Sequence, residues 1–217
     1  MTTTPLHSAS LVHVTHDAEQ LISKLARVSN PTNEDNHETA PRLIRYLIDH
    51  QHWSPFEMAS MCVEIHTTRD ISAQILRHRS FSFQEFSTRY AEVADAEIPD
   101  LRGQDLKNRQ NSIEGIFVPE WLKAEVESHI NSGFALYHNL LDHGVAKECA
   151  RRILPLSTRT RLYMHGTVRS WIHYLQVRTN VDTQLEHRRV ACSCMTVFQE
   201  NFPNIFNAAF LENDPTH

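Results

Sequence analysis

Apolar residues recur every three or four positions along much of this chain, a spacing that is typical of amphipathic helices. In residues 17–28, Leu21, Ile22, Leu25 and Val28 follow this spacing and predict a helix with one apolar face. We expect further helices over residues 41–50, 69–78, 119–143, 146–154, 167–178, 182–200 and 204–212.

Alternation of apolar and polar residues marks other segments and predicts strands. Residues 61–67 and 158–165 alternate in this way. If residues 81–89 are extended, every second side chain shares one face, namely Phe81, Phe83, Glu85, Ser87 and Arg89. Because helices dominate and the strands are few and separated, we expect an α+β fold.

The segments between these elements carry turn residues and polar residues. Ser54-Pro55-Phe56-Glu57 has the form of a capping box and predicts a short helical turn. Residues 30–40 read as a loop, and the polar residues 91–117 read as an exposed excursion.

Length and charge narrow the class of protein. The chain has 217 residues, and we expect one domain over residues 1–217. Its formal net charge of -5 gives no overall basic field for nucleic acid, so we expect no nucleic-acid partner. No apolar run approaches the ~20 residues of a membrane span. Residues 1–15 lack the features of a secretory signal, so we expect a cytoplasmic protein without a membrane partner.

The basic residues are unusually rich in arginine. Arginine outnumbers lysine 17 to 4, and 12 of the arginines lie in residues 69–89 and 151–189. The planar guanidinium fits phosphate and carboxylate oxygens, so these windows favour anion sites; surface ion pairs are the alternative. The five glycines form no Gly-rich phosphate turn, so side chains would have to bind any nucleotide phosphate.

The densest group of such side chains is Arg77-His78-Arg79, followed after seven residues by Ser87 and then by Arg89. Its alternative interpretation is a solvated helix end. On the helix over 167–178, Arg169 and His173 are neighbours, whereas Arg178 points about half a turn away from Arg169. Either Arg178 lies past the helix end, or the helix lies between two ligands or two subunits.

The four cysteines and the histidines show no metal-binding spacing. Cys62, Cys149, Cys192 and Cys194 form no CxxC pair, and the last two should point to different helix faces. Buried free thiols are the better interpretation of all four. No HExxH occurs, and arginines flank His78, so we expect no metal site.

At this point the motifs resemble those of a known family, the flavin-dependent thymidylate synthases. The resemblance is carried by the spaced Arg77-His78-Arg79 and Ser87 signature and by its companions in order along the chain. These companions are His52 with Ser54-Pro55-Phe56-Glu57, Gln74, Glu85-Phe86-Ser87-Thr88-Arg89-Tyr90, Ala150-Arg151-Arg152-Ile153-Leu154-Pro155, Arg169-Ser170-Trp171-Ile172-His173 and Gln176-Val177-Arg178.

The resemblance implies an activity and an assembly. The family makes thymidylate (dTMP) from deoxyuridylate (dUMP), with methylenetetrahydrofolate as carbon donor and FAD reduced by NADPH as hydride source. It also implies helices around a small, mostly antiparallel sheet, and a homotetramer with active sites between subunits.

The resemblance further implies which residues bind the ligands. The positions that match the dUMP site are Gln74, Ile75, Leu76, Arg77, Glu85, Phe86, Ser87, Thr88, Arg89, Arg151 and Arg178. Those that match the FAD site are Ser54, Arg77, His78, Arg79, Glu85, Thr167, Val168, Arg169 and His173. Arg89 and Arg151 suit the phosphate, and Arg178 matches the catalytic residue that stabilises the ionised uracil ring.

Three positions depart from the family pattern. Thr88 stands where several relatives have glycine, Thr167 where some have asparagine and Met58 where some have histidine.

Two competing functions also remain at this point. One is a single-strand nucleic-acid binder that uses the aromatics Phe81, Phe83, Phe86 and Tyr90, and the other is a metal-dependent nucleotide hydrolase.

Overall fold

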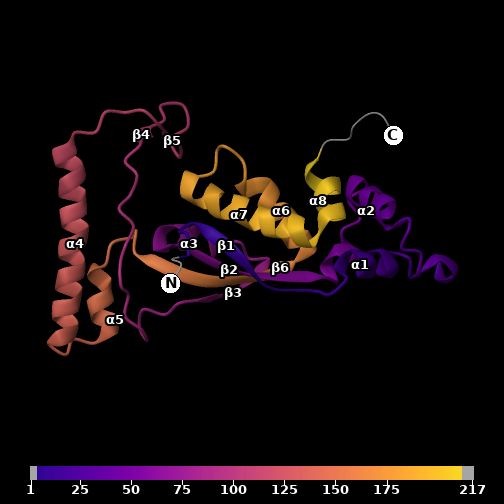
Figure 1. The fold of residues 1–217 in the computed structure, drawn as a ribbon, viewed down its shortest axis with the longest axis horizontal. Helices are drawn as coiled ribbons and strands as arrows, with labels where there is room; N and C mark the ends of the chain where they lie inside the picture. The colour runs from indigo at the N-terminus through magenta and orange to yellow at the C-terminus, as the bar shows by residue number, and fades with distance from the viewer. Residues whose placement is uncertain (1–3, 212–217) are drawn as a thin grey trace.

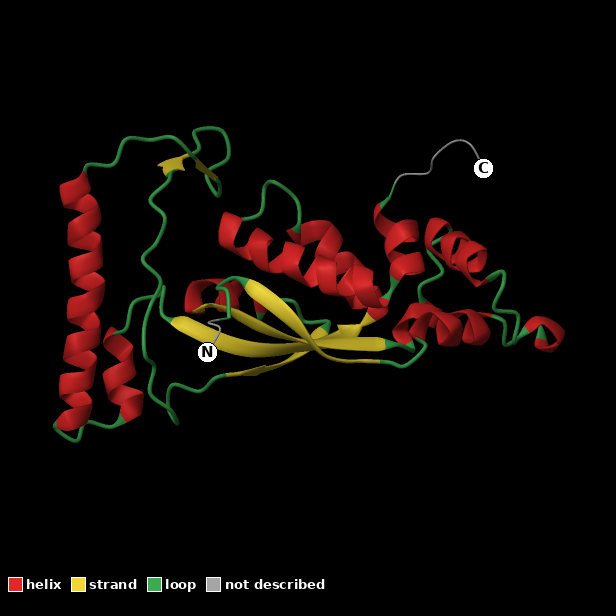
Figure 2. Ribbon diagram, in the orientation of Figure 1, coloured by secondary structure: helices red, strands yellow, loops and turns green. Residues whose placement is uncertain are grey.

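A four-stranded antiparallel sheet lies at the centre of the computed structural model, which describes residues 4–211. Helices lie above the sheet and at both of its ends in the view of Figures 1 and 2. In spatial order the strands are β1 (Ser8–Val14), β2 (Ser60–Thr68), β6 (Arg159–Thr167) and β3 (Phe81–Glu85). The α+β prediction is therefore confirmed.

One face of the sheet forms the main hydrophobic core. Met61, Val63 and Ile65 of β2 are fully buried, as are Leu162 and Met164 of β6. Glu64, Arg161 and Tyr163, which alternate with them, are half-buried or exposed, as the period of a strand requires. Apolar burial on one face fixes the register of these strands.

Two long helices cover this apolar face. α6 (Val168–Arg178) follows β6 directly, and its buried Trp171 donates from Nε1 to the carbonyl oxygen of Met61 at 3.0 Å. α7 (Leu185–Asn201) packs on α6 and on β1. α3 (Arg69–Ile75) contacts α7 and buries Ile71 and Ile75.

Shorter helices complete the body and surround one end of the sheet (Figure 1). α2 packs on α8 and α1, and η2 contacts α1 and α6. Their bounds are α1 (Ala18–Ala26), η1 (Pro31–Asn33), α2 (Ala40–Asp49), η2 (Ser54–Glu57) and α8 (Pro203–Phe210).

The segment from about residue 91 to residue 154 forms an arm at the opposite end of the molecule. Its long helix α4 packs on the short helices, and Val93, Ile130, Phe134, Tyr137 and Ala150 form a second, smaller hydrophobic core. Figure 1 shows α4 and α5 standing apart from α6 and α7. The elements of the arm are β4 (Gly103–Gln104), β5 (Ser112–Ile113), α4 (Glu120–Asp142), α5 (Lys147–Ala150) and η3 (Arg151–Ile153).

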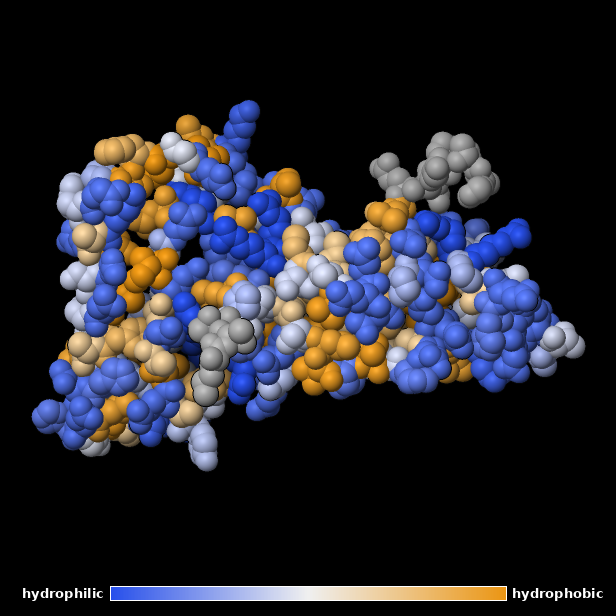
Figure 3. Space-filling model, viewed as in Figure 1, coloured by the Kyte–Doolittle hydropathy of each residue, from blue (hydrophilic) through white to orange (hydrophobic). Residues whose placement is uncertain are grey.

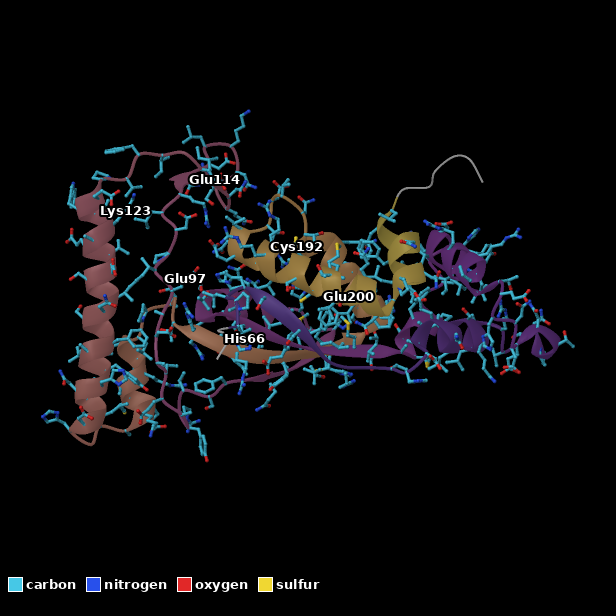
Figure 4. The ribbon with its side chains drawn as sticks, in the orientation of Figure 1. His66, Glu97, Glu114, Lys123, Cys192 and Glu200 are labelled. Atoms are coloured by element: carbon cyan, nitrogen blue, oxygen red, sulfur yellow. The ribbon has the colours of Figure 1, made fainter. Side chains whose placement is uncertain are left out.

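Near its beginning, the excursion 91–117 is tied to the body by a buried histidine. His7 is buried, and its Nε2 lies 3.0 Å from Glu97 Oε2 while its Nδ1 lies 3.0 Å from Thr67 Oγ1. Glu97 lies on the segment between β3 and β4 (Figure 4). The excursion also contains the β4–β5 hairpin, which the sequence did not predict.

All the predicted helices occur, with ends that differ by a few residues. The predicted strand 81–89 ends at Glu85, so the shared face holds for Phe81, Phe83 and Glu85 only. Beyond it, the backbone nitrogens of Tyr90 and Ala91 donate to the carbonyl oxygen of Ser87, which closes a turn.

Two further predictions need correction. The capping box at Ser54 is wrong, because the Ser54 side chain makes no cap hydrogen bond and Glu57 pairs with Arg169 instead. The prediction of four buried thiols holds for Cys62 and Cys194, but Cys149 and Cys192 are exposed. Cys192 and Cys194 do face opposite sides of α7, and Figure 4 labels Cys192 on that helix. Within residues 4–211, no helix has the length and apolar character to span a bilayer.

Candidate active site

The Arg77-His78-Arg79 motif lies in the turn between α3 and β3 rather than on the helix that the sequence predicted. α3 ends at Ile75, and the backbone nitrogens of Arg77 and His78 still bond to the last turn of the helix. Arg77 and Arg79 are exposed, and no acidic side chain within residues 4–211 forms an ion pair with either. The turn therefore presents two uncompensated guanidiniums, which suit an anionic ligand.

Arg178, at the end of α6, contacts this turn through His78. Its Nε donates to His78 Nε2 at 2.9 Å. Burial, and then the charge of Arg178, lower the pKa of His78 to about 4, so the imidazole is neutral near pH 7. Because Nε2 accepts this bond, the proton of the neutral ring is on Nδ1. This bond fixes the guanidinium and leaves its two terminal nitrogens for a ligand.

Gln74 lies next to the same pair and is held by α7. Its Nε2 donates to Gln184 Oε1 at 2.7 Å, and its Oε1 lies 3.3 Å from His187 Nδ1. Burial, followed by the charges of Arg178 and His78, lowers the pKa of His187 to about 3. We call Gln74, His78 and Arg178 the Arg178 group.

Sequence reasoning missed Gln184 and His187. A signal was present for the histidine, because His187 falls on the helix face that buries Val190 and Cys194. A polar residue on a buried stripe needs a hydrogen-bonding partner, and that need points to a polar cluster.

A second set of predicted nucleotide residues lies where the arm meets the chain after β3. Arg151 Nη1 donates to Thr88 Oγ1 at 3.1 Å, and Arg89 Nη2 lies 3.3 Å from Glu148 Oε2. Thr88 is buried. Ser87 and Arg89 line a cavity of about 360 Å³ together with Glu148 and its neighbours. We call Thr88, Arg89 and Arg151 the Arg151 group.

The two groups are separate within one chain. The Arg178 group belongs to α3, its following turn and α6, whereas Arg151 begins η3 directly after α5. Figure 1 shows α5 apart from α6, and no hydrogen bond or ion pair among the described side chains joins the groups. A single chain therefore does not bring the predicted dUMP residues into one pocket.

The side chains of other predicted nucleotide residues already have hydrogen-bond or packing partners within the protein. Glu85 Oε1 accepts from Ser72 Oγ at 2.8 Å and from Thr160 Oγ1 at 3.0 Å, with Arg69 at 3.6 Å. Phe86 packs against the core of the arm. The Ile75 side chain is in the main core, while Leu76 is exposed.

Two of the predicted flavin residues lie at another cavity, of about 480 Å³. Arg169 and His173 of α6 line it, as their spacing predicted, and Arg169 forms an ion pair with Glu57 across it. Ser54 lies one residue from the cavity-lining Trp53 and is exposed. The lining residues are Trp53, Glu57, Ser80, Arg169, Ser170, Ile172, His173 and Gln176.

Two residues assigned to the flavin have structural partners. Thr167 caps α6, because its Oγ1 accepts from the backbone nitrogen of Ser170 at 3.2 Å. The Val168 side chain is fully buried, and its backbone nitrogen donates to Ala59 at 2.9 Å. Neither the side chain nor the backbone nitrogen of Val168 is therefore free to contact a ligand.

A further cavity, of about 520 Å³, lies between the excursion and α4, and none of the predicted site residues lines it. Figure 3 shows apolar surface around the gap between the arm and the body. Among residues 4–211, no three histidine, cysteine or acidic side chains are grouped to hold a metal ion.

These features define a class of protein: an α+β fold that carries guanidiniums on several elements, which suit phosphate oxygens. The profile of the family described as "Thymidylate synthase complementing protein" matches residues 10–204. The chain belongs to this family, the flavin-dependent thymidylate synthases.

The relatives match over most of their length. The chain is 50% identical over 213 residues to a probable flavin-dependent thymidylate synthase of Paramecium bursaria Chlorella virus 1, covering 93% of this chain and 98% of the relative. It is 48% identical over 196 residues to the flavin-dependent thymidylate synthase of a Synechocystis strain, covering 89% of each. A solved structure of the UMP/dUMP methylase PolB from Streptomyces cacaoi, bound with 5-Br dUMP, matches with a TM-score of 0.82 and 29% identity over 93% of each chain.

Proposed function

We propose that this protein is a flavin-dependent thymidylate synthase that reductively methylates dUMP to dTMP. Methylenetetrahydrofolate supplies the carbon, and FAD reduced by NADPH supplies the hydride. The observation that carries the proposal is the Arg178 guanidinium, which the neutral His78 holds by one nitrogen at 2.9 Å while two nitrogens stay available. The names of the relatives support the same reaction.

Arg178 stabilises the negative charge that develops on the uracil ring. C5 of uracil must become electron-rich before it attacks the methylene carbon, and loss or polarisation of the N3 proton makes it so. A fixed guanidinium beside N3 and its neighbouring carbonyl stabilises the resulting negative charge. The neutral imidazole of His78 orients that guanidinium without adding a competing charge.

The phosphate of dUMP is the ligand of the Arg151 group. Arg89 and Arg151 provide guanidiniums, and the bond that Arg151 donates to Thr88 limits the motion of Arg151. Ser87, which lines the same cavity, serves in binding. Glu85 acts by fixing β3 to α3 and β6, since Ser72 and Thr160 already use one of its oxygens.

FAD fits the remaining cationic surface. Arg77 and Arg79 are free of ion pairs within the described chain, and they would neutralise the pyrophosphate that no Gly-rich turn can hold. His78, Arg169 and His173 would hold the rest of the cofactor, with Ser54 next to Trp53 of the 480 Å³ cavity. When bound, FAD supplies the hydride that completes the methyl group.

Part of this proposal is that the active site forms between protomers of a homotetramer. The separation of the Arg178 group from the Arg151 group supports it, because each group alone lacks part of the predicted nucleotide site. We include in the proposal a single domain over residues 1–217 and a cytoplasmic location, where the charged co-substrates are found.

Neither of the two buried cysteines is suited to act as the nucleophile that the other type of thymidylate synthase uses. Cys194 lies near Tyr174, but complete burial raises the pKa of its thiol far above neutral pH. A thiol must ionise to act as a nucleophile. Cys62 is also buried, and burial raises its pKa as well.

The test is thymidylate formation by purified, flavin-loaded protein supplied with dUMP, methylenetetrahydrofolate and NADPH. The Arg178→Ala variant should lose at least about 100-fold in turnover, the scale of removing one transition-state donor, while it keeps its flavin absorbance. Arg189→Ala, an exposed arginine on α7, is the matched control and should stay active. Normal turnover of Arg178→Ala, or a wild-type protein that takes up no FAD, would refute the proposal.

A further inference from the structure

We propose that Arg102 and Glu186 are positioning residues that set which end of the Gln74 amide faces the nucleotide. The inference rests on the proposed function, in which Gln74 contacts dUMP. Neither residue belongs to the predicted dUMP or FAD site. A chain of hydrogen bonds connects the excursion to Gln74.

The chain begins at a nearly buried ion pair. Arg102 Nη2 donates to Glu186 Oε1 at 2.6 Å, and only 10% and 12% of the two side chains are exposed. Arg102 is itself held on the excursion, because its Nε donates to Ser112 Oγ at 2.8 Å. Figure 1 shows the β4–β5 hairpin close to the start of α7, which is where this pair joins them.

Glu186 fixes which group donates and which accepts in each of these hydrogen bonds, because a carboxylate can only accept hydrogen bonds. Burial would raise the pKa of Glu186, but hydrogen bonds from Arg102, Gln184 and its own backbone outweigh that effect and lower the pKa. Glu186 is therefore an anion near neutral pH. Its Oε2 accepts from Gln184 Nε2 at 3.0 Å, which turns the carbonyl of Gln184 toward Gln74.

Each following group then has one allowed role. The carbonyl of Gln184 requires the amide nitrogen of Gln74, at 2.7 Å. The carbonyl of Gln74 accepts from His187, which must be protonated on Nδ1, and His187 Nε2 accepts from the hydroxyl of Tyr174 at 3.2 Å. Burial raises the pKa of Tyr174 well above its usual value, so that hydroxyl keeps its proton. In each of these hydrogen bonds, the acceptor is the group nearer to Glu186 along the series.

The consequence concerns what Gln74 presents to a ligand. One of its two amide hydrogens is used by Gln184, so the other is free to donate to a carbonyl or phosphate oxygen of the nucleotide. A neutral amide at position 186 would remove the constraint, because it could donate to Gln184 as well as accept from it. Gln184 and Gln74 could then both turn round, and Gln74 would present an oxygen to an oxygen of the substrate.

The experiment is a double-mutant cycle on flavin-loaded protein, with the KM for dUMP as the readout. Glu186→Gln removes the constraint on the direction of the hydrogen bonds. Gln184→Met removes the hydrogen bonds that link Glu186 to Gln74, while the Arg102–Glu186 pair remains. Each should raise the KM about 3- to 10-fold, the range of one net hydrogen bond. If Glu186 acts through Gln184, the double variant should be no worse than Gln184→Met alone. Arg109→Ala, an exposed arginine on the same hairpin, is the control.

Two results would overturn the inference: an unchanged KM in both single variants, or effects that multiply in the double variant, as two unrelated structural roles would give. If Glu186→Gln does not fold, Arg102→Met takes its place in the cycle. Without Arg102, burial raises the pKa of Glu186, and a protonated carboxyl group can donate to Gln184 as well as accept from it. Arg102→Lys is expected to restore part of the affinity. Failure of the proposed function would appear differently, as a wild-type protein that makes no thymidylate.

Discussion

At the scale of single residues, the site depends on imidazoles that burial keeps neutral. The pKa of His187 is lowered to about 3 and that of His78 to about 4, in both cases first by burial and then by Arg178. Protonation of either ring would place a second cation beside the guanidinium and break the bonds that these rings accept. Neutral histidines are therefore a condition for the geometry of Arg178 and Gln74.

This condition predicts an acid-sensitive fold. Both histidines have folded-state pKa values below the usual 6.5, so the unfolded chain binds more protons between about pH 6.5 and pH 3–4. The free energy of unfolding should thus fall as the pH is lowered through this window. His187→Gln should flatten this dependence, measured by urea unfolding at pH 7.5 and pH 5. The exposed His129→Gln is the control, and an equal pH dependence of His187→Gln and wild type would contradict the account.

Thr88, which departs from the family pattern, has a structural role that glycine could not have. The side chain that replaces glycine at this position is buried, and its hydroxyl accepts from Arg151. The larger residue therefore orients a guanidinium of the Arg151 group.

Thr88→Val keeps the shape of the side chain and removes this hydroxyl. We expect dUMP binding to weaken by about 2- to 12-fold, as the loss of one net hydrogen bond gives, with flavin content unchanged. Titration of flavin-loaded protein with dUMP measures it. Thr196→Val, at an exposed position on α7, should bind dUMP normally. An unaltered dissociation constant for Thr88→Val would mean that the bond does not contribute to binding.

At the scale of elements, a close contact between β3 and β6 positions the turn that carries the motif. Phe81 lies opposite Gly166, and its ring packs against the position where a side chain of residue 166 would begin. The same ring stacks edge-on against Trp171 at 4.9 Å and approaches Tyr174 at 5.8 Å. His78 contacts Tyr174 edge-on, so this aromatic cluster connects the sheet to the Arg178 group.

Gly166→Ala should therefore displace Phe81 and destabilise the fold by about 1–3 kcal/mol, the usual cost of overpacking. Thermal unfolding measures this as a lower Tm, by roughly 2–4 °C for each kcal/mol. Gly133→Ala is the matched control, since its added methyl group meets only ordinary contact in α4. There, alanine should stabilise the helix by about 0.5–1 kcal/mol. A Gly166→Ala protein as stable as wild type would show that Phe81 has room to move.

The elements also show what sequence patterns can and cannot predict. Periodicity located α4, α6 and α7 because each buries one stripe against a core. It missed β1, where the register shifts between Leu11 and His13 and the alternation breaks. It also extended β3 too far, since nothing in the pattern of residues 81–89 reveals the turn that closes at Ser87.

The sequence predicted which residues belong to the candidate site better than it predicted where the fold places them. The signature predicted the guanidiniums and the neighbouring Arg169 and His173, which do line one cavity. It did not predict the chain from Arg102 to Gln74, because contacts between residues more than 80 positions apart depend on tertiary packing. Buried polar groups such as Glu186 became interpretable only with their partners.

At the scale of the whole molecule, the arm separates two halves of the predicted nucleotide site. α4 and α5 have their own small core, and they hold the Arg151 group away from α6 (Figure 1). A second protomer that brings its Arg151 group to the Arg178 group of the first would complete the site. In a symmetric assembly the same contact recurs at every interface of that kind.

The central claim is tested most directly by mixing two inactive variants, Arg89→Ala and Arg178→Ala, by co-expression. If each site takes Arg89 from one protomer and Arg178 from another, random assembly should rebuild about one quarter of the sites with both arginines present. Thymidylate formation should return to about that fraction of wild type. Co-expressed Gln74→Ala and Arg178→Ala, which alter one and the same group, should show no more activity than the average of the two parent proteins. Mixed Arg89→Ala and Arg178→Ala assemblies that remain as inactive as their parents would contradict a site shared between protomers.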